Sequence, residues 1–148
     1  MKLNQIHVVE FQSILDSGEF EVGEITCLVG KNESGKTALL QALYRLNPII
    51  EGDGKYSVTD DYPRRNVEDY RLAVEAGEGK HARVVKAVFE LEEDDVEAVA
   101  AIVGHDALRG RTLTLSNGYD DALWFEYPVD DSAALRACEK TCRIRSPN

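Results

Sequence analysis

The stretch that sets the architecture is Gly30-Lys31-Asn32-Glu33-Ser34-Gly35-Lys36-Thr37, which matches the pattern G-x-x-x-x-G-K-[ST] at every fixed position. In this pattern successive backbone N–H groups form a nest for anions, and the helix that follows adds its positive dipole end. Gly35 lets the backbone approach phosphate oxygens without a Cβ in the way. We expect Lys36 to reach the β- and γ-phosphates of ATP and the Thr37 hydroxyl to bind Mg²⁺. The residues expected at the phosphates are Gly30, Asn32, Glu33, Ser34, Gly35, Lys36 and Thr37.

The segments on either side of this loop support the same interpretation. Residues 25–29 form a short apolar run bounded by glycines, which is typical of a strand buried on both faces. Cys27 would then be a small core residue. A helix is expected from Lys36 to about Leu46, where Asn47-Pro48 would end it. Its apolar face, at three- and four-residue spacing, consists of Leu39, Leu40, Leu43 and Leu46.

The rest of the chain predicts strands and short helices joined by turns. Residues 3–11 carry β-type side chains, and a short helix is expected to start near Asn66. Residues 85–91 alternate between apolar and polar, which predicts a strand with one buried face. Asn117-Gly118 suits a type I′ turn, so a β-hairpin is expected around it. The remaining expected segments are a loop over 51–63, a helix over 94–103, hairpin strands over 112–115 and 122–127, and a last helix over about 132–142.

Together these expectations describe an α/β chain of the P-loop NTPase class. One domain is expected over residues 1–148, which is long enough for a real core. Its phosphate-binding core would cover about residues 1–50, and an antiparallel β-rich portion would cover about 80–130. The phosphate loop would follow a buried strand of a central sheet, with the antiparallel portion packed beside it.

Composition limits the classes of partner that this chain can have. The formal net charge of −10 repels nucleic acid unless basic residues cluster, and Arg64-Arg65 is one of only two tight basic groups. This pair lies in a loop and is expected to be solvated. No apolar run approaches the roughly 20 residues that span a bilayer, and the first residues lack the apolar part of a secretory signal. We therefore expect a cytoplasmic protein that does not contact membranes.

The three cysteines do not predict a disulfide framework, because their number is odd and no secretion signal precedes them. Cys138 and Cys142 are four residues apart on one face of an expected helix. Two thiols at that spacing could bind a metal, but no further His or Cys stands near them to complete a site. A structural role is therefore the preferred interpretation.

Two segments together resemble a known family. The strand end Glu10-Phe11-Gln12-Ser13-Ile14 and the run from Leu28 to Leu43, with Asn32 inside the phosphate loop, resemble the start of an ABC-type ATPase head. The nearest branch is SMC-like and includes the ATPases of the overcoming-lysogenization-defect (OLD) nucleases and related AAA-labelled defence ATPases. The piece Asp61-Tyr62-Pro63-Arg64-Arg65 is also similar to OLD-like chains. The resemblance implies that Gln12 and Ser13, and also Asp16, approach the nucleotide.

Such heads hold ATP between two lobes and hydrolyse it at a dimer interface, and this chain is similar to the first lobe only. The acids after Val88-Phe89 do not form a Walker B strand, because Glu90 interrupts the apolar run. Residues 115–118 are expected in a hairpin turn rather than in a signature loop. His81 and His105 are expected at the surface. No catalytic residue is therefore assigned, and hydrolysis is expected to need the remainder of the head or a dimer partner.

Three functions remain open at this point. The first is a MgATP-binding lobe of an SMC/OLD-like ATPase from a DNA-processing or phage-defence protein, in which DNA would contact other parts of the assembly. The second is a small P-loop kinase, which the antiparallel pattern of the second half disfavours. The third is a regulatory or scaffold module with a residual phosphate loop, which the intact Lys36 and Thr37 disfavour.

Overall fold

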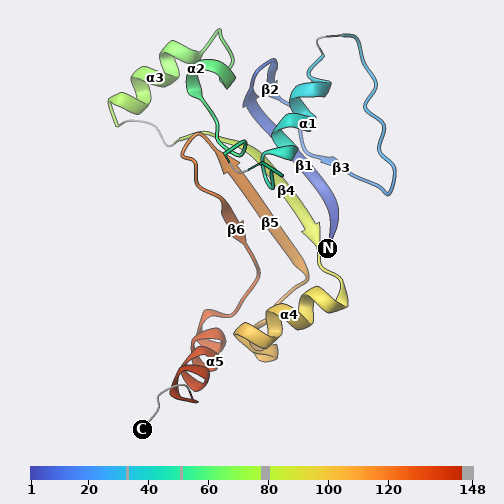
Figure 1. The fold of residues 1–148 in the computed structure, drawn as a ribbon, viewed down its shortest axis with the longest axis vertical. Helices are drawn as coiled ribbons and strands as arrows, with labels where there is room; N and C mark the ends of the chain where they lie inside the picture. The colour runs from blue at the N-terminus through green and yellow to red at the C-terminus, as the bar shows by residue number, and fades with distance from the viewer. Residues whose placement is uncertain (33, 51, 78–80, 145–148) are drawn as a thin grey trace.

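The computed structural model describes residues 1–32, 34–50, 52–77 and 81–144, with side chains described up to residue 137 (Figure 1). The strands are β1 (Lys2–Phe11), β2 (Ile14–Asp16), β3 (Phe20–Glu21), β4 (Arg83–Glu90), β5 (Thr112–Gly118) and β6 (Trp124–Glu126). The helices are α1 (Lys36–Tyr44), α2 (Val58–Asp61), α3 (Val67–Glu75), α4 (Glu93–Val103), the 3₁₀ turn η1 (His105–Ala107) and α5 (Asp131–Ile144). None of the described helices has the length and apolar character needed to cross a membrane.

One antiparallel sheet organises the described chain. Its strand order is β2-β1-β4-β5-β6, and β3 pairs with β1 near its start, on the edge opposite β4. The central strand β4 pairs with β1 (Ile6 opposite Ala87) and with β5 (Ala87 opposite Leu115). A strand with a neighbour on each side satisfies nearly all its backbone N–H and C=O groups, which is why β4 can be buried.

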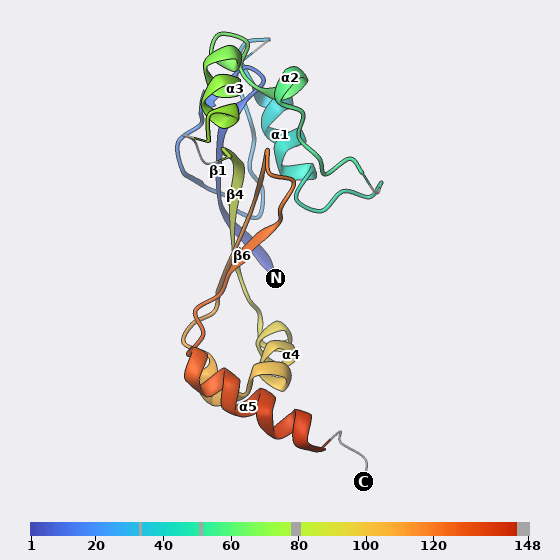
Figure 2. The same cartoon turned by 90° about the vertical axis from the view of Figure 1, so that its left-hand side faces the viewer.

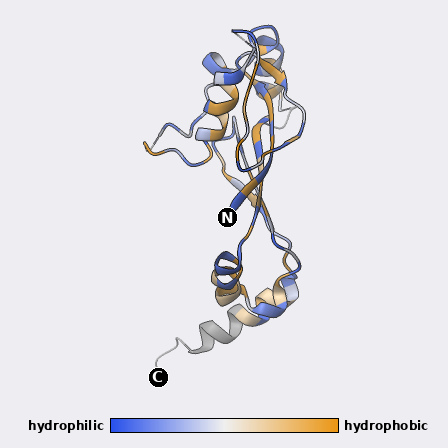
Figure 3. Cartoon of the chain, turned by 90° about the vertical axis from the view of Figure 1, so that its right-hand side faces the viewer, coloured by the Kyte–Doolittle hydropathy of each residue, from blue (hydrophilic) through white to orange (hydrophobic). Residues whose placement is uncertain are grey.

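The core lies on the face of the sheet that α1 covers. Ile6 and Val8 of β1 alternate with outward residues and are buried, as period-two alternation requires. Apolar residues follow the strands and one side of α1 (Figure 3). The remaining buried apolar residues of this cluster are Phe11, Ile14, Ala38, Leu39, Ala42, Leu46, Tyr56, Tyr62, Val84, Val85, Ala87 and Tyr119.

The two ends of the molecule carry different helices. Helices α1, α2 and α3 lie at one end, whereas α4 and α5 lie at the other, beyond the far ends of β4 and β5 (Figures 1 and 2). Helix α4 begins at a capping box in which Glu92 and Asp95 bond each other's backbone N–H. The end with α1 to α3 contains the phosphate loop, which directly precedes α1.

Several expectations are confirmed. Helices α3, α4 and α5 occur within a few residues of their expected bounds, with Gly104 directly after α4. Strand β4 has Val85 and Ala87 buried, although Val84 is buried as well. The hairpin between β5 and β6 forms with Thr114 opposite Glu126. The antiparallel portion therefore follows the sequence pattern closely.

The expected buried strand over residues 25–29 is wrong. Ile25 is 94% exposed, Val29 is 89% exposed, and Cys27 is exposed rather than in the core. No described strand pairs with this run, so its backbone groups have no ladder. Of its side chains, that of Leu28 is partly buried and packs against the core. The described sheet is therefore the antiparallel one, and it contains no buried strand that leads into the phosphate loop.

Three smaller expectations are corrected as well. Asn117-Gly118 ends β5 instead of forming the turn, because the Asn117 side chain donates to the Gly54 carbonyl (3.1 Å). The connection to β6 therefore runs through residues 119–123. Helix α1 ends at Tyr44, and Leu40 is 56% exposed instead of lying on the buried face. The expected loop over 51–63 contains α2, which Ser57 caps through its hydroxyl.

Candidate functional site

The phosphate loop turns into helix α1 at Gly35. This residue has a φ of 86°, in the left-handed region, and is the N-cap of α1. A Cβ at Gly35 would lie 2.9 Å from Cγ1 of Ile14, so the loop passes too close to the β1–β2 turn for a side chain. No side chain caps the helix start, which leaves the first-turn N–H groups facing outward. A helix N-terminus with unpaired N–H groups is suited to bind an anion such as phosphate.

The Lys36 ammonium folds back over its own loop. Its Nζ donates to the carbonyl oxygens of Gly30 (2.8 Å) and Lys31 (2.6 Å), and to the Ser34 hydroxyl (3.2 Å). These are three oxygen acceptors of the kind that phosphate oxygens can replace. The loop's own oxygen atoms therefore hold the Lys36 ammonium in place.

An open pocket of about 360 Å³ lies between the β1–β2 turn and the start of α1. Six of the ten residues expected to contact nucleotide line it, and they come from two separate segments of the chain, residues 12–13 and 32–37. Thr37 is exposed in this pocket. The described lining consists of Gln12, Ser13, Asn32, Gly35, Lys36, Thr37 and Ala38.

The other expected residues are not part of the described lining. The Gly30 carbonyl and the Ser34 hydroxyl accept hydrogen bonds from the Lys36 ammonium. Glu33 lies outside the described residues. Asp16 instead accepts hydrogen bonds from the Gly18 N–H (2.8 Å) and from His7 (2.7 Å), which hold the pKa of its carboxyl below its ordinary value.

Two residues of this site were not expected from the sequence. Ala38 lines the pocket, and Gln41 accepts a hydrogen bond from Nε2 of Gln12 (3.0 Å). The spacing of four between Thr37 and Gln41 puts both on one helix face, which is a signal that could have identified Gln41. The hydrogen bond fixes the Gln12 carboxamide against α1.

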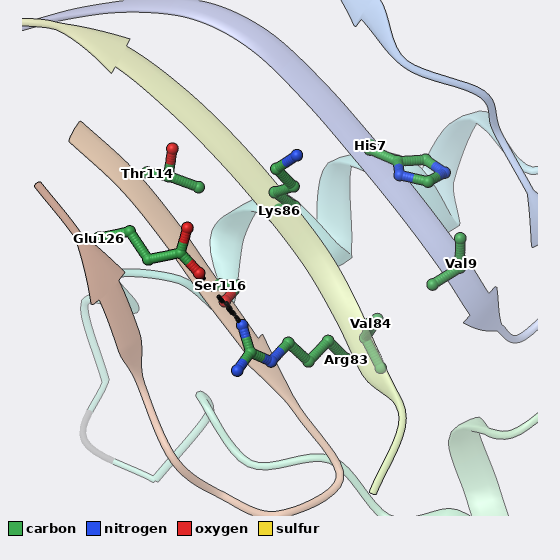
Figure 4. Close-up of a pocket in the computed structure, with 8 residues that line it drawn as sticks. All are labelled: His7, Val9, Arg83, Val84, Lys86, Thr114, Ser116 and Glu126. Carbon is green, nitrogen blue, oxygen red and sulfur yellow. Dashed lines mark hydrogen bonds and ion pairs between the residues drawn. The ribbon is translucent and has the colours of Figure 1, made fainter. Parts of the chain in front are cut away.

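A second pocket lies on the opposite, open face of the sheet (Figure 4). Its cations already have partners: Lys86 is 3.2 Å from Glu19, and Arg83 is 3.7 Å from Glu126 while its guanidinium stacks over Trp124. None of the residues expected to bind nucleotide lines it. Its lining is His7, Val9, Arg83, Val84, Lys86, Thr114, Ser116 and Glu126.

Other candidates from the sequence do not form a site. Arg64 and Arg65 are exposed between α2 and α3, and His81 and His105 are exposed as well. Within the described part of the chain, no group of three His, Cys, Asp or Glu residues could hold a metal ion. The side chains of Cys138 and Cys142 lie outside the described part.

Comparison with known proteins identifies the family. The model of the AAA ATPase domain matches residues 1–98, which is 98 of the 148 residues and includes the whole pocket around Lys36. A comparison with curated proteins gives no match. An AAA ATPase domain binds nucleotide, typically together with Mg²⁺, and the Gly35 cradle and uncapped helix start fit a phosphate chain. This chain belongs to the AAA ATPase domain family.

Proposed function

We propose that this chain is the MgATP-binding lobe of an SMC/OLD-like ATPase head that belongs to a cytoplasmic DNA-processing or phage-defence protein. The observation that carries the proposal is the shared pocket, in which Gln12 and Ser13 face Lys36 and Thr37. The phosphate-loop motif assigns Lys36 and Thr37 to the nucleotide, and the resemblance adds Gln12 and Ser13. The geometry supports binding of the triphosphate by one surface built from the β1–β2 turn, the phosphate loop and the start of α1.

Each residue has a separate task in this proposal. The first-turn N–H groups of α1 and the Lys36 ammonium bind the β- and γ-phosphates, and Lys36 exchanges the Gly30 and Lys31 carbonyls for phosphate oxygens. Thr37 offers its hydroxyl to Mg²⁺, which would neutralise the phosphate charge. Gln12 places its carboxamide beside the same phosphates.

Hydrolysis would be completed by residues from the remainder of the head or from a dimer partner. The described lining of the pocket has no carboxylate that could orient the attacking water. The run over residues 25–29 leads directly into the phosphate loop, and no described strand pairs with it, so a strand of such a partner could do so. DNA would contact other parts of the assembly, since this chain carries a net charge of −10.

The test is a titration of a fluorescent ATP analogue with and without Mg²⁺, with phosphate release followed in parallel. Lys36→Ala removes charge-assisted hydrogen bonds and should weaken binding by about tenfold or more. Lys31→Ala is the matched control, because it removes a neighbouring exposed lysine and leaves the backbone carbonyl in place. Equal affinities for wild type and Lys36→Ala would contradict the proposal. Phosphate release by the chain alone would favour a complete enzyme such as a small P-loop kinase.

A further inference from the structure

The β1–β2 turn enters the phosphate pocket through strained backbone. Gln12 has a φ of 51° and Glu10 a φ of 50°, although neither is glycine. A left-handed conformation at such residues persists only where the surroundings hold it, and it is enriched at functional sites. What holds these two residues therefore bears on how the Gln12 side chain reaches the pocket.

Helix α2 holds Gln12. The Gln12 N–H donates to the backbone carbonyl of Asp61, the last residue of α2, at 2.6 Å. The Asp61 side chain is buried, with the residue only 5% exposed, and it accepts from Nη1 (2.6 Å) and Nη2 (3.2 Å) of Arg45. It also accepts from the Ser57 N–H at 2.9 Å. A buried carboxylate with this many donors fixes the end of α2 and, with it, the carbonyl that binds Gln12.

Arg45 connects Asp61, and with it the end of α2, to helix α1. It is the C-cap residue of α1, and its guanidinium lies over the rings of Phe11 (5.1 Å) and Tyr56 (4.9 Å). The Gln12 carboxamide meets α1 one turn earlier, at Gln41. Both contacts of Gln12, through its backbone to Asp61 and through its side chain to Gln41, therefore depend on where α1 lies.

Glu10 is held by two tyrosines. The Tyr62 hydroxyl donates to the Glu10 carboxylate (2.7 Å), and the Tyr119 hydroxyl donates to the Glu10 carbonyl (2.8 Å). Burial raises the pKa of both phenols, so both remain donors over the whole range of a binding experiment. The two strained residues on either side of Phe11 are thus held from separate directions.

We propose that the partly buried Arg45–Asp61 pair positions the nucleotide-binding side chain of Gln12. The pair keeps the Asp61 carbonyl against the Gln12 N–H, which holds Gln12 in its left-handed conformation with its carboxamide in the pocket beside Lys36 and Thr37. Gln41 holds the carboxamide until a phosphate oxygen takes its place as acceptor. The inference rests on the proposed MgATP site and makes Asp61 and Arg45 positioning residues that do not touch the ligand.

A double-mutant cycle on MgATP affinity tests this role. Gln12→Ala removes the side chain that is positioned, and Asp61→Asn weakens the pair that positions it. Each single variant should lose about three- to tenfold in affinity, the range of one hydrogen bond. The double variant should lose no more than the larger single loss, because Asp61 acts through Gln12. Losses that multiply would overturn the proposal.

Matched variants separate positioning from folding. Asp60→Asn changes the neighbouring exposed carboxylate of α2, which contacts the Ser57 hydroxyl rather than Arg45, and should leave affinity unchanged. Arg45→Lys keeps the charge but loses the two-pronged contact, so it should show part of the Asp61→Asn loss, which again disappears in the Gln12→Ala background. A loss by Arg45→Lys that persists in that background would count against the proposal even if Asp61→Asn fails to fold.

The same titration distinguishes the two proposals. If wild type binds MgATP and Lys36→Ala does not, while the Gln12 and Asp61 losses multiply, the site stands and the positioning role fails. If wild type and Lys36→Ala are equally weak, the proposed function fails and the positioning role fails with it. If Lys36→Ala is weak and the cycle is non-additive, both are supported.

Discussion

Strand β4 and the run over residues 25–29 are built from similar kinds of residue but lie in opposite environments. Both are short, rich in β-type side chains and close to glycine. Strand β4 has a neighbour on each edge, and its Val84 and Ala87 are fully buried. The run has no neighbour among the described strands, and Ile25 and Val29 are almost fully exposed.

The contrast shows that the partner, and not the segment, makes the strand. A β-strand satisfies its backbone groups only through another strand, so β-propensity expresses itself where a ladder is available. The phosphate loop connects the unpaired run over residues 25–29 to helix α1. Its shape is therefore maintained by local contacts, chiefly the Lys36 ammonium on the loop carbonyls and the close approach of Gly35 to Ile14.

The largest expected effect tests the paired side of this comparison. Phe11 ends β1, is fully buried and packs edge-on against Tyr56 at 5.5 Å. Phe11→Ala should lower the free energy of unfolding by about 3–5 kcal/mol, because it removes apolar burial and leaves a cavity. Urea unfolding followed by circular dichroism measures the change. A decrease in the free energy of unfolding below about 1 kcal/mol would mean that Phe11 contributes no more to stability than an exposed residue of the 25–29 run.

A pair of glycine substitutions sharpens the comparison at the next level. A Cβ at Gly118, at the end of β5, would meet the backbone carbonyl of Ala82, which cannot move without breaking the sheet. At Gly23, before the run, the nearest atom would be the Ile25 carbonyl oxygen at an ordinary 3.8 Å. Gly118→Ala should therefore destabilise the fold by about 1–3 kcal/mol, whereas Gly23→Ala should be neutral or slightly stabilising. Equal melting temperatures for the two variants would contradict the close approach of the Ala82 carbonyl to Gly118.

Acid should loosen the turn that leads from the sheet towards the run. Asp16 bonds the Gly18 N–H and His7, and these contacts lower the pKa of its carboxyl. A lowered pKa in the folded state gives stability that is complete above the ordinary value of 3.8 and is lost as pH falls through the folded value. An NMR titration of the Gly18 amide should show its shift change below pH 3.8, and Asp16→Asn should abolish that titration. A midpoint above 3.8 would exclude the proposed contacts.

The sequence predicted those parts of the fold whose signals are local. Helices α3 and α4 follow from apolar spacing, from acids in the first turn and from Gly104, while the alternation of residues 85–91 identifies β4. Asn117 misled because its side chain bonds the Gly54 carbonyl, a contact 63 residues away that no local rule contains. Residues 25–29 misled because burial depends on a partner strand, which a single run cannot reveal.

The site divides in the same way. Gly35, Lys36 and Thr37 follow from the motif, since their spacing encodes the loop. The presence of Gln12 in the same pocket came only from resemblance, and the contacts that hold it, from Asp61 and Gln41, could not be predicted. They depend on the contact between Arg45, at the end of α1, and Asp61 of α2, and on residues 29 and 49 positions from Gln12 in the chain.

The smallest expected effect is the most direct test of the comparison. Val29→Ala removes two methyl groups that already face solvent, so it should change the free energy of unfolding by no more than about 0.5 kcal/mol. Hydrogen exchange supplies the second measurement: amides 25–29 should exchange much faster than amides 84–89 of β4, which lie in two ladders. A destabilisation above about 1.5 kcal/mol, or equal protection of the two segments, would mean that the run is packed in solution. If a partner strand completes the head, adding that partner should slow exchange over 25–29 and raise the effect of Val29→Ala, while β4 stays unchanged. The run would then be a strand whose ladder is supplied by another segment, which is the state that its sequence predicts.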